Sequence, residues 1–317
     1  MWSNKVSTER HENMNRLLEI ANLIDKTYED GIGVNPKDGD NLPSRTEVIA
    51  LTEKLLELIY PGYANQTGLP DTMIMLAEIQ NDLASQIRRA IRRSSQGKGN
   101  PQIHCQFEGV CKDGYSRCKE SAFKLLESLP LLREIAKADV AAAYAGDPAA
   151  YTYDEIILSY PGLKAVTIQR LAHVLYVEKI PLIPRMMTEY AHSLTGIDIH
   201  PGATLGKGIF IDHGTGVVVG ETAVLGDNVR IYQGVTLGAG NFPKDACGMI
   251  IKGQKRHPTI GNNVTIYSGA SVLGDVTIGD NSVIGGNVWL TESLLPGTKV
   301  TALPPENKLK MAGERKL

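Results

Sequence analysis

The spacing of apolar residues along the chain changes near Thr195. Up to that point apolar residues recur every three or four positions, which is typical of one buried face of an α-helix. Five segments with this spacing are predicted helices: residues 13–28, 47–60, 71–93, 115–150 and 163–194. Stretches rich in glycine and proline separate these segments. Asp71, which follows a proline, is the predicted N-cap of the third helix.

Beyond Thr195 the apolar period is six. Six aliphatic residues stand six apart without a break: Ile260, Ile266, Val272, Ile278, Ile284 and Leu290. Earlier runs starting at Ile199 and Val219 have the same form, and a spacing of eight between Ile211 and Val219 shifts the phase by two. A repeat of this kind is typical of a solenoid, in which each unit forms a short strand and a sharp corner and three units close one triangular coil.

The glycine distribution supports the solenoid, since 20 of the 32 glycines lie between Gly196 and Gly297, where tight corners favour residues that accept a positive φ. We therefore predict an α+β protein: an all-helical N-terminal domain over residues 1–195, a parallel β-helix of hexapeptide repeats over 196–300 and a tail over 301–317. The alternative is a β-sandwich with glycine-rich turns, which six consecutive in-phase units disfavour. Residues 239–259 break the repeat and are a predicted loop, a usual place for substrate contacts.

Composition narrows the function classes. The net charge of −2 over 317 residues gives no field that would attract nucleic acid or an anionic membrane. No apolar run reaches the length of a membrane span, and the N-terminus has no signal-peptide pattern, so we expect a cytoplasmic protein. Four cysteines fit a reducing compartment. The spacing of Cys105, Cys111 and Cys118 matches zinc sites poorly, so we expect free thiols and no metal.

Candidate chemistry centres on one histidine of the repeat region. Asp198 and His213 are fifteen residues apart, close to one coil of eighteen, so the two side chains are predicted to lie on neighbouring rungs within hydrogen-bond reach. A carboxylate that orients an imidazole makes a general base. The alternative is that Asp198 caps a turn and His213 fills a corner.

Four motifs resemble those of the serine O-acetyltransferase family. They are Asp198-Ile-His-Pro-Gly, Ile211-Asp-His-Gly-Thr-Gly-Val-Val-Val-Gly-Glu-Thr222, Gln233-Gly-Val-Thr-Leu-Gly238 and Arg256-His-Pro258, and upstream Gly146-Asp147-Pro148-Ala149 and Tyr160-Pro161-Gly162 are also similar. The resemblance covers about half of the chain, and the order of these motifs is more specific than the hexapeptide repeat. It implies a left-handed coil, a transferase that uses acetyl-CoA, and the L-serine hydroxyl as acceptor in cysteine biosynthesis.

The resemblance also assigns roles to residues. His213 is implied to be the general base and Asp198 the residue that orients it. The amino acid is implied to bind Asp147, Asp212, Arg256 and His257, which suits a zwitterion because a guanidinium grips a carboxylate and an aspartate suits an ammonium. Acetyl-CoA is implied to lie in a groove between coils of two subunits, with walls from Gly238, Ala239, Gly269 and Ala270.

The family forms trimers through the coil, often joined as dimers of trimers by the helical halves. Its members dock to O-acetylserine sulfhydrylase through a terminal isoleucine, whereas this chain ends in Lys316-Leu317, so we do not expect that docking. Three other functions stay open: a hexapeptide acetyltransferase of a sugar or antibiotic hydroxyl, a non-catalytic assembly scaffold, and a zinc-dependent hydratase on the same coil. The acceptor, the binding of acetyl-CoA and the metal content separate them.

Overall fold

The computed structural model describes residues 2–28, 42–63, 71–96, 114–245 and 247–303. The chain forms two units, residues 1–42 and Pro43–Leu317. Among its described residues the first unit carries helix α1 (Trp2–Thr27), whose residues from Asn13 on are exposed.

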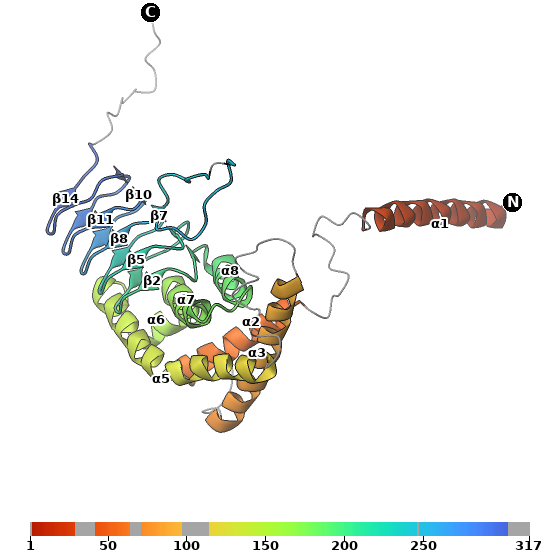
Figure 1. The fold of residues 1–317 in the computed structure, drawn as a ribbon, viewed down its shortest axis with the longest axis horizontal. Coiled ribbons are helices and arrows are strands. Elements are labelled where there is room, and N and C mark those ends of the chain that lie inside the picture. Colours follow the sequence, from red (N-terminus) through yellow and green to blue (C-terminus); the bar gives the residue numbers. More distant parts are fainter. Residues whose placement is uncertain (1, 29–41, 64–70, 97–113, 246, 304–317) are drawn as a thin grey trace, which may run out of the picture. The chain divides into compact units, whose positions relative to one another are not determined.

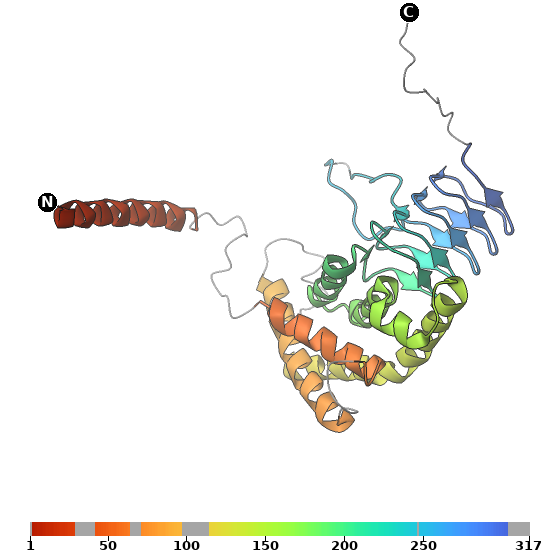
Figure 2. The ribbon, with the colours of Figure 1, turned by 180° about the vertical axis from the view of Figure 1, so that it is seen from behind.

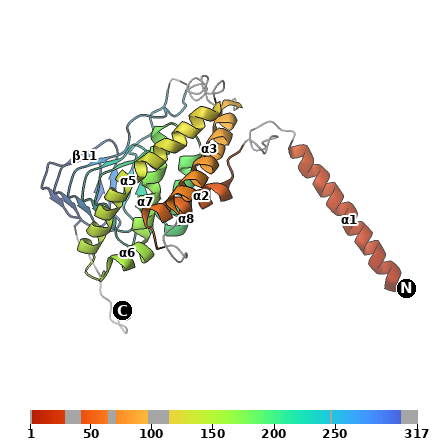
Figure 3. The ribbon, with the colours of Figure 1, turned by 90° about the horizontal axis from the view of Figure 1, so that it is seen from below.

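The helical part of the second unit comprises α2 (Arg45–Ile59), α3 (Thr72–Gln96), α5 (Gly114–Gly146), α6 (Tyr153–Ser159), α7 (Pro161–Val177) and α8 (Ile183–Thr195). Figure 3 shows α2, α3, α5 and α7 packed side by side. Their shared core is aliphatic, with Leu55, Ile87, Leu125 and Leu171 fully buried. The Asp71 carboxylate accepts hydrogen bonds from the backbone N–H groups of Met73 and Ile74, which confirms the predicted N-cap.

Three predicted helix limits are wrong. The helix expected to begin at residue 13 begins at Trp2. The helix expected over residues 163–194 is broken into α7 and α8, because Lys179 and Leu182 take positive φ angles of 62° and 65° around a proline. The helix expected to reach residue 150 ends at Gly146, and the short helix α6 follows. A run of apolar residues therefore located the helical material but not its breaks.

The hexapeptide region is a stack of short parallel strands, as predicted. Three sheets run along it, which we name by their strands: sheet A is β1-β4-β7-β10-β13, sheet B is β2-β5-β8-β11 and sheet C is β3-β6-β9-β12-β14. The strands are β1 (Asp198–Ile199), β2 (Thr204–Leu205), β3 (Phe210–Ile211), β4 (Val218–Val219), β5 (Val224–Leu225), β6 (Arg230–Ile231), β7 (Thr236–Gly238), β8 (Thr259–Ile260), β9 (Thr265–Ile266), β10 (Ser271–Leu273), β11 (Thr277–Ile278), β12 (Val283–Ile284), β13 (Trp289–Leu290) and β14 (Lys299–Val300).

The order of strands visits sheets A, B and C in turn, so each set of three strands forms one coil (Figures 1 and 2). The repeating aliphatic residues point into one continuous core that includes Ile199, Val219, Leu237, Val272 and Leu290. In each strand the residue directly before the inward aliphatic residue points away from the core of the coil, because successive side chains of a strand alternate between its two faces. The apolar period of six therefore arises because each successive strand places one aliphatic residue in this core.

The coils differ in length. Asp198 pairs with Val218, so the first coil takes 20 residues, whereas Val218 pairs with Thr236, 18 residues on. The next coil, from Thr236 to Ser271, takes 35 residues, because the predicted loop leaves the stack between β7 and β8 (Figure 1). Within that loop Lys244 and Ile250 form an antiparallel bridge.

The helices are joined to the first coil by close packing. Phe210 of β3 is buried against α5, where a Cβ on Gly146 would lie 2.5 Å from its ring, and a Cβ on Gly162 of α7 would lie 2.1 Å from the Ile211 carbonyl oxygen. A buried ion pair between Asp139 and Arg170 adds polar contacts. The change from helix to strand at residues 195–198 thus lies inside one compact unit, and the helices hold the first coil in place.

In the part of the chain that the structure describes, no helix is both long and apolar enough to cross a membrane.

Candidate functional site

The corner between sheets C and A, which we call the CA corner, carries His213. This corner joins β3 to β4 and contains the phase shift seen in the sequence. At the later CA corners one left-handed residue precedes the inward aliphatic, whereas here His213 with φ 57° and Gly214 with φ 79° are added before that residue. A left-handed backbone is strained for a residue with a Cβ. The two extra residues push the imidazole outward, and its side chain is 69% exposed.

One carboxylate contacts this imidazole, and a second, which is bonded to a phenol, lies within range of its charge. His213 Nδ1 lies 3.6 Å from Asp212 Oδ1. Asp147, at the end of α5, accepts a hydrogen bond of 2.6 Å from the Tyr160 hydroxyl and one of 2.8 Å from the Ala149 N–H. These bonds, and then the charge of His213, lower the pKa of Asp147. The structure therefore brings together three of the predicted residues, Asp147, Asp212 and His213.

The predicted contact between Asp198 and His213 is absent within the single chain. Asp198 Oδ1 instead lies 3.5 Å from Arg185 Nη1 of α8. The reason is the register: Asp198 stacks beside Val218, and His213 sits at the corner before that strand rather than on the adjacent rung. Within one chain, then, the carboxylate beside His213 is that of Asp212.

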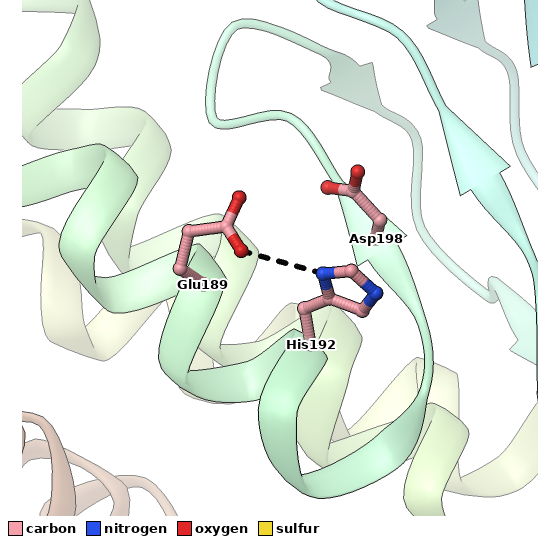
Figure 4. A group of neighbouring side chains, drawn as sticks. All are labelled: Glu189, His192 and Asp198. Atoms are coloured by element: carbon pink, nitrogen blue, oxygen red, sulfur yellow. Dashed lines mark hydrogen bonds and ion pairs between the residues drawn. The ribbon is translucent and has the colours of Figure 1, made fainter.

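Asp198 belongs to an ion network with α8 (Figure 4). Ligand atoms of Glu189, His192 and Asp198 lie within 4.8 Å of one another, a spacing that a metal ion also requires. However, the Arg185 guanidinium contacts both carboxylates, at 2.5 Å from Glu189 Oε1 and 3.5 Å from Asp198 Oδ1. It supplies the positive charge that a cation would bring, so this group fits a structural ion network better than a metal site.

The corner between sheets A and B, which we call the AB corner, carries Arg256. Its Nη2 lies 2.5 Å from Glu221 Oε2, and the other oxygen of Glu221 accepts a hydrogen bond of 2.7 Å from the Tyr176 hydroxyl. Burial opposes ionisation of Glu221, but the bonds from Tyr176 and Arg256 lower its pKa overall. The guanidinium is thus already held in one orientation, with further N–H groups that can donate to a second carboxylate.

His257 is the buried member of this corner, with 6% of its surface exposed. Its Nδ1 accepts a hydrogen bond of 3.1 Å from the Thr222 N–H. The ring packs so closely on Gly220 that a Cβ there would lie 2.0 Å from it. Burial, and then the charge of Arg256, lower the pKa of His257 to about 4. The imidazole is therefore neutral at neutral pH, and because Nδ1 accepts, the proton lies on Nε2.

The two corners lie at opposite edges of sheet A. His213 precedes the sheet A strand β4, and Glu221 follows it. Arg256 and His257 enter the stack next to Glu221 and Thr222, at the same edge as those residues. The single chain thus carries the predicted base at one edge of a sheet face and the predicted carboxylate binders at the other. No described contact joins the two groups.

The predicted acetyl-CoA walls fit only in part. Gly238 and Ala239 are half-buried and Gly269 is exposed. Gly269 has a φ of 71° and a Cβ there would lie 2.4 Å from Asn287 Oδ1, so the chain has no room for a side chain at that corner. Ala270 is fully buried in the core of the coil. Its side chain points inward, as the small residue of each repeat does, so a contact of Ala270 with acetyl-CoA would come from its backbone, and the four predicted wall residues stay a prediction.

Sequence reasoning missed two residues of these corners. Tyr160 holds Asp147, and Glu221 holds Arg256. Both stand inside or next to motifs that had been recognised, in Tyr160-Pro161-Gly162 and in the stretch that ends Gly220-Glu221-Thr222. The available signal was a charged or phenolic residue inside or next to a recognised motif, which could have been predicted to hold a binding residue in place.

Comparisons with known proteins agree with the fold and the motifs. Residues 257–292 match the bacterial transferase hexapeptide family (six repeats). A serine acetyltransferase named as plasmid-borne, from Synechococcus elongatus, is 44% identical over 82% of this chain and 82% of its own length. The serine acetyltransferase of Mycobacterium tuberculosis is 48% identical over 53% of this chain and 69% of its own length.

Solved structures give the same result. Serine acetyltransferase 1 of Entamoeba histolytica, in complex with L-cysteine, has a TM-score of 0.63 and 38% identity over 80% of this chain and 86% of its own. Isoform 3 from the same organism, also with cysteine, has a TM-score of 0.64 and 35% identity over 83% of this chain and 84% of its own. The predicted helical part followed by a left-handed parallel β-helix is confirmed. This chain belongs to the serine acetyltransferase family.

Proposed function

We propose that this protein is a serine O-acetyltransferase, which transfers an acetyl group from acetyl-CoA to the hydroxyl of L-serine and so serves cysteine biosynthesis. Its family supports this function. The observation that carries the proposal is the CA corner, where a strained, exposed imidazole lies 3.6 Å from Asp212 and within range of the charge of Asp147. Strain, exposure and flanking carboxylates together are typical of a catalytic base rather than of a corner residue.

The residues around His213 define its task. The imidazole accepts the proton of the serine hydroxyl while the serine oxygen attacks the thioester carbonyl carbon. The charge that develops on the carbonyl oxygen needs hydrogen-bond donors, which the backbone N–H groups of a glycine-rich corner can offer. When the carbon–sulfur bond breaks, the imidazolium returns the proton to the departing thiolate. The carboxylates of Asp212 and Asp147 stabilise the imidazolium and attract the ammonium group of the acceptor.

The AB corner supplies the other half of the acceptor site. The Arg256 guanidinium, already fixed by Glu221, has N–H groups left for the serine carboxylate. The neutral His257 adds a donor that does not depend on pH near neutrality. A sugar or an antibiotic acceptor lacks a carboxylate and would not use this corner, which is why serine is the better candidate.

Because the two halves lie at opposite edges of sheet A, we propose that the complete site forms between copies of the chain in a homotrimer. A heterologous contact that joins the CA corner of one copy to the AB corner of the next generates a closed ring. Asp198 faces outward on sheet A between the two corners. Its role in orienting His213 is therefore proposed for the assembled protein, across the contact, and Arg185 is its partner within the chain.

An acceptor screen tests the function. Purified protein is mixed with acetyl-CoA and either L-serine, D-serine, a galactoside or chloramphenicol, and free thiol is measured. We expect thiol release with L-serine above all other acceptors. Release with a sugar or antibiotic but not with L-serine would replace the proposal by the alternative acetyltransferase. No release with any acceptor, together with no acetyl-CoA binding by calorimetry, would indicate a scaffold.

A further inference from the structure

Two tyrosines form a stacked pair on the coil directly beyond the candidate base. Tyr232 follows β6 and Tyr267 follows β9, at the position that Asp212 occupies after β3. The backbone ladder confirms this column, because Asp212 donates to the Ile231 carbonyl, Tyr232 to that of Ile266 and Tyr267 to that of Ile284. The two rings are nearly parallel, at 12° to each other, with centroids 5.2 Å apart. We call this pair the tyrosine ledge.

One face of the ledge is open. Tyr232 is half-buried between Asp212 and Tyr267, and burial, then Tyr267 and Asp212, raise the pKa of its hydroxyl. Tyr267 is 44% exposed. The residue that follows Tyr267 in the column is Gly285, which has no side chain to cover the outer face of the ring. A flat aromatic surface is therefore presented to solvent at the end of a column that begins beside His213.

The position of the ledge suits one part of the donor. Strands in a sheet lie about 4.8 Å apart, so the rung of Tyr267 is about 10 Å along the coil from the rung of Asp212 and His213. The thioester of acetyl-CoA must reach His213, while its adenine lies at the far end of a long flexible arm. Planar bases stack on tyrosine rings in many nucleotide-binding proteins.

The charge on the neighbouring sheet fits a nucleotide as well. Arg230 of β6 and Lys299 of β14 point outward from sheet C, and both are exposed. They stand on rungs on either side of the Tyr267 rung, in the order β6-β9-β12-β14. Cationic side chains on both sides of an exposed ring are suited to phosphate groups attached to a stacked base.

We propose that the outer face of Tyr267 binds the adenine of acetyl-CoA by stacking, so that the tyrosine ledge places the donor's thioester at His213. The proposal rests on the proposed function for the identity of the donor. It assigns to the ledge a role in positioning and donor specificity, not in proton transfer. Donors that lack the nucleotide should therefore be indifferent to Tyr267.

The test compares a whole donor with its fragments. Tyr267→Leu removes the aromatic face and keeps apolar bulk, Tyr267→Phe keeps the face, and Phe123→Leu, an exposed aromatic on α5, is the matched control. Calorimetry measures the binding of CoA, 3′,5′-adenosine diphosphate and pantetheine to each full-length variant. Steady-state kinetics then give the KM for acetyl-CoA and for acetyl-pantetheine, and circular dichroism checks folding.

For Tyr267→Leu we expect about tenfold weaker binding of CoA and of the adenosine diphosphate, which corresponds to ~1.4 kcal/mol and lies within the range for one base–aromatic stack. Pantetheine binding and the KM values for acetyl-pantetheine and L-serine should not change. Tyr267→Phe and Phe123→Leu should resemble the unmodified protein.

Unchanged CoA binding in Tyr267→Leu would overturn the proposal, and so would an equal loss for CoA and pantetheine, because the ring would then contact the arm or only support the fold. If Tyr267→Leu does not fold, Tyr267→Gln takes its place, and unchanged CoA binding in that variant, or an equal loss for CoA and pantetheine, would overturn the proposal in the same way. The two proposals can fail separately. If the unmodified protein turns over L-serine and Tyr267→Leu binds the nucleotide equally well, the ledge is refuted and the function stands. If Tyr267→Leu loses nucleotide binding but the unmodified protein leaves L-serine unreacted, the function is refuted and the ledge stands.

Discussion

The CA and AB corners are built from the same repeat but differ in almost every physical respect. His213 at the CA corner is exposed, has a left-handed backbone and has as its only described ion-pair partner a carboxylate at 3.6 Å. At the AB corner Arg256 is fixed by an ion pair and His257 is buried with its acceptor nitrogen satisfied. The corner proposed for proton transfer is therefore open and strained, whereas the corner proposed for recognition of the acceptor is preorganised. A substitution at one corner should therefore leave the other corner intact.

Replacement of His213 should have the largest effect. His213→Asn removes the base but suits the left-handed corner, since Asn228, Asn263, Asn281 and Asn287 take the same backbone conformation. Loss of general acid–base catalysis lowers kcat by about 10²- to 10⁴-fold. The KM for L-serine and the melting temperature should change little, because the side chain is exposed. Initial rates of the variant give kcat and KM, and thermal unfolding gives its melting temperature. A kcat near the unmodified value would show that His213 is not the base.

Replacement of Arg256 should mainly raise the KM for L-serine. A hydrogen bond to a charged group contributes about 1.5–3 kcal/mol, which corresponds to roughly 10- to 150-fold. Glu221→Gln should give a smaller increase, because it frees the guanidinium without removing it. Lys255→Gln, next in sequence, is the control for a change of charge. An Arg256→Gln variant that lowers kcat alone would show that this corner acts in the chemical step instead.

The buried His257 predicts a pH dependence of stability. Its folded pKa of about 4 lies below the ordinary value of 6.5, so between these values the unfolded chain binds a proton that the folded chain does not. The free energy of unfolding should therefore fall as pH falls from 6.5 to 4, by at most ~3 kcal/mol from this group. His257→Asn keeps an acceptor and does not titrate. Urea unfolding at several pH values should show a shallower slope in this variant, and equal slopes would contradict the buried neutral imidazole.

The smallest effect concerns the bond that orients Asp147. Tyr160→Phe removes the hydroxyl that donates to Asp147 Oδ2 and leaves the ring in place. A typical hydrogen bond contributes about 0.5–1.5 kcal/mol, so the KM for L-serine should rise roughly two- to tenfold. The pKa of Asp147, measured by carbon-13 NMR of its carboxyl, should rise toward its ordinary value. If neither quantity changes, Tyr160 only caps the helices that it joins.

Much of the fold could be predicted from the sequence because a period of six has a single physical meaning. The six aliphatic residues that stand six apart from Ile260 to Leu290 are all buried in one core, and even the slip before Val219 corresponds to a real insertion at a corner. The helix limits could not be predicted so well. The break between α7 and α8 depends on positive φ angles at Lys179 and Leu182, two residue types that do not ordinarily signal a turn.

The site was predictable in its members but not in their arrangement. The motifs identified His213, Asp212, Asp147, Arg256 and His257, yet the expected contact of Asp198 assumed a regular coil of eighteen residues. The first coil has 20 residues, and its two additional residues are the ones that expose His213. A count along the chain cannot show on which edge of a triangular coil a residue falls when an insertion precedes it.

In the proposed trimer the complete site joins the CA corner of one copy to the AB corner of another. Complementation tests this claim most directly. His213→Asn and Arg256→Gln chains are unfolded, mixed in equal amounts and refolded, and the rate with acetyl-CoA is measured at an L-serine concentration below the KM of the unmodified protein, where each variant alone is nearly inactive. In a closed ring with random mixing about one quarter of the contacts pair an intact CA corner with an intact AB corner, so the account predicts about one quarter of the unmodified activity. A mixture no more active than the two variants measured separately would contradict it, because each site would then be confined to one chain.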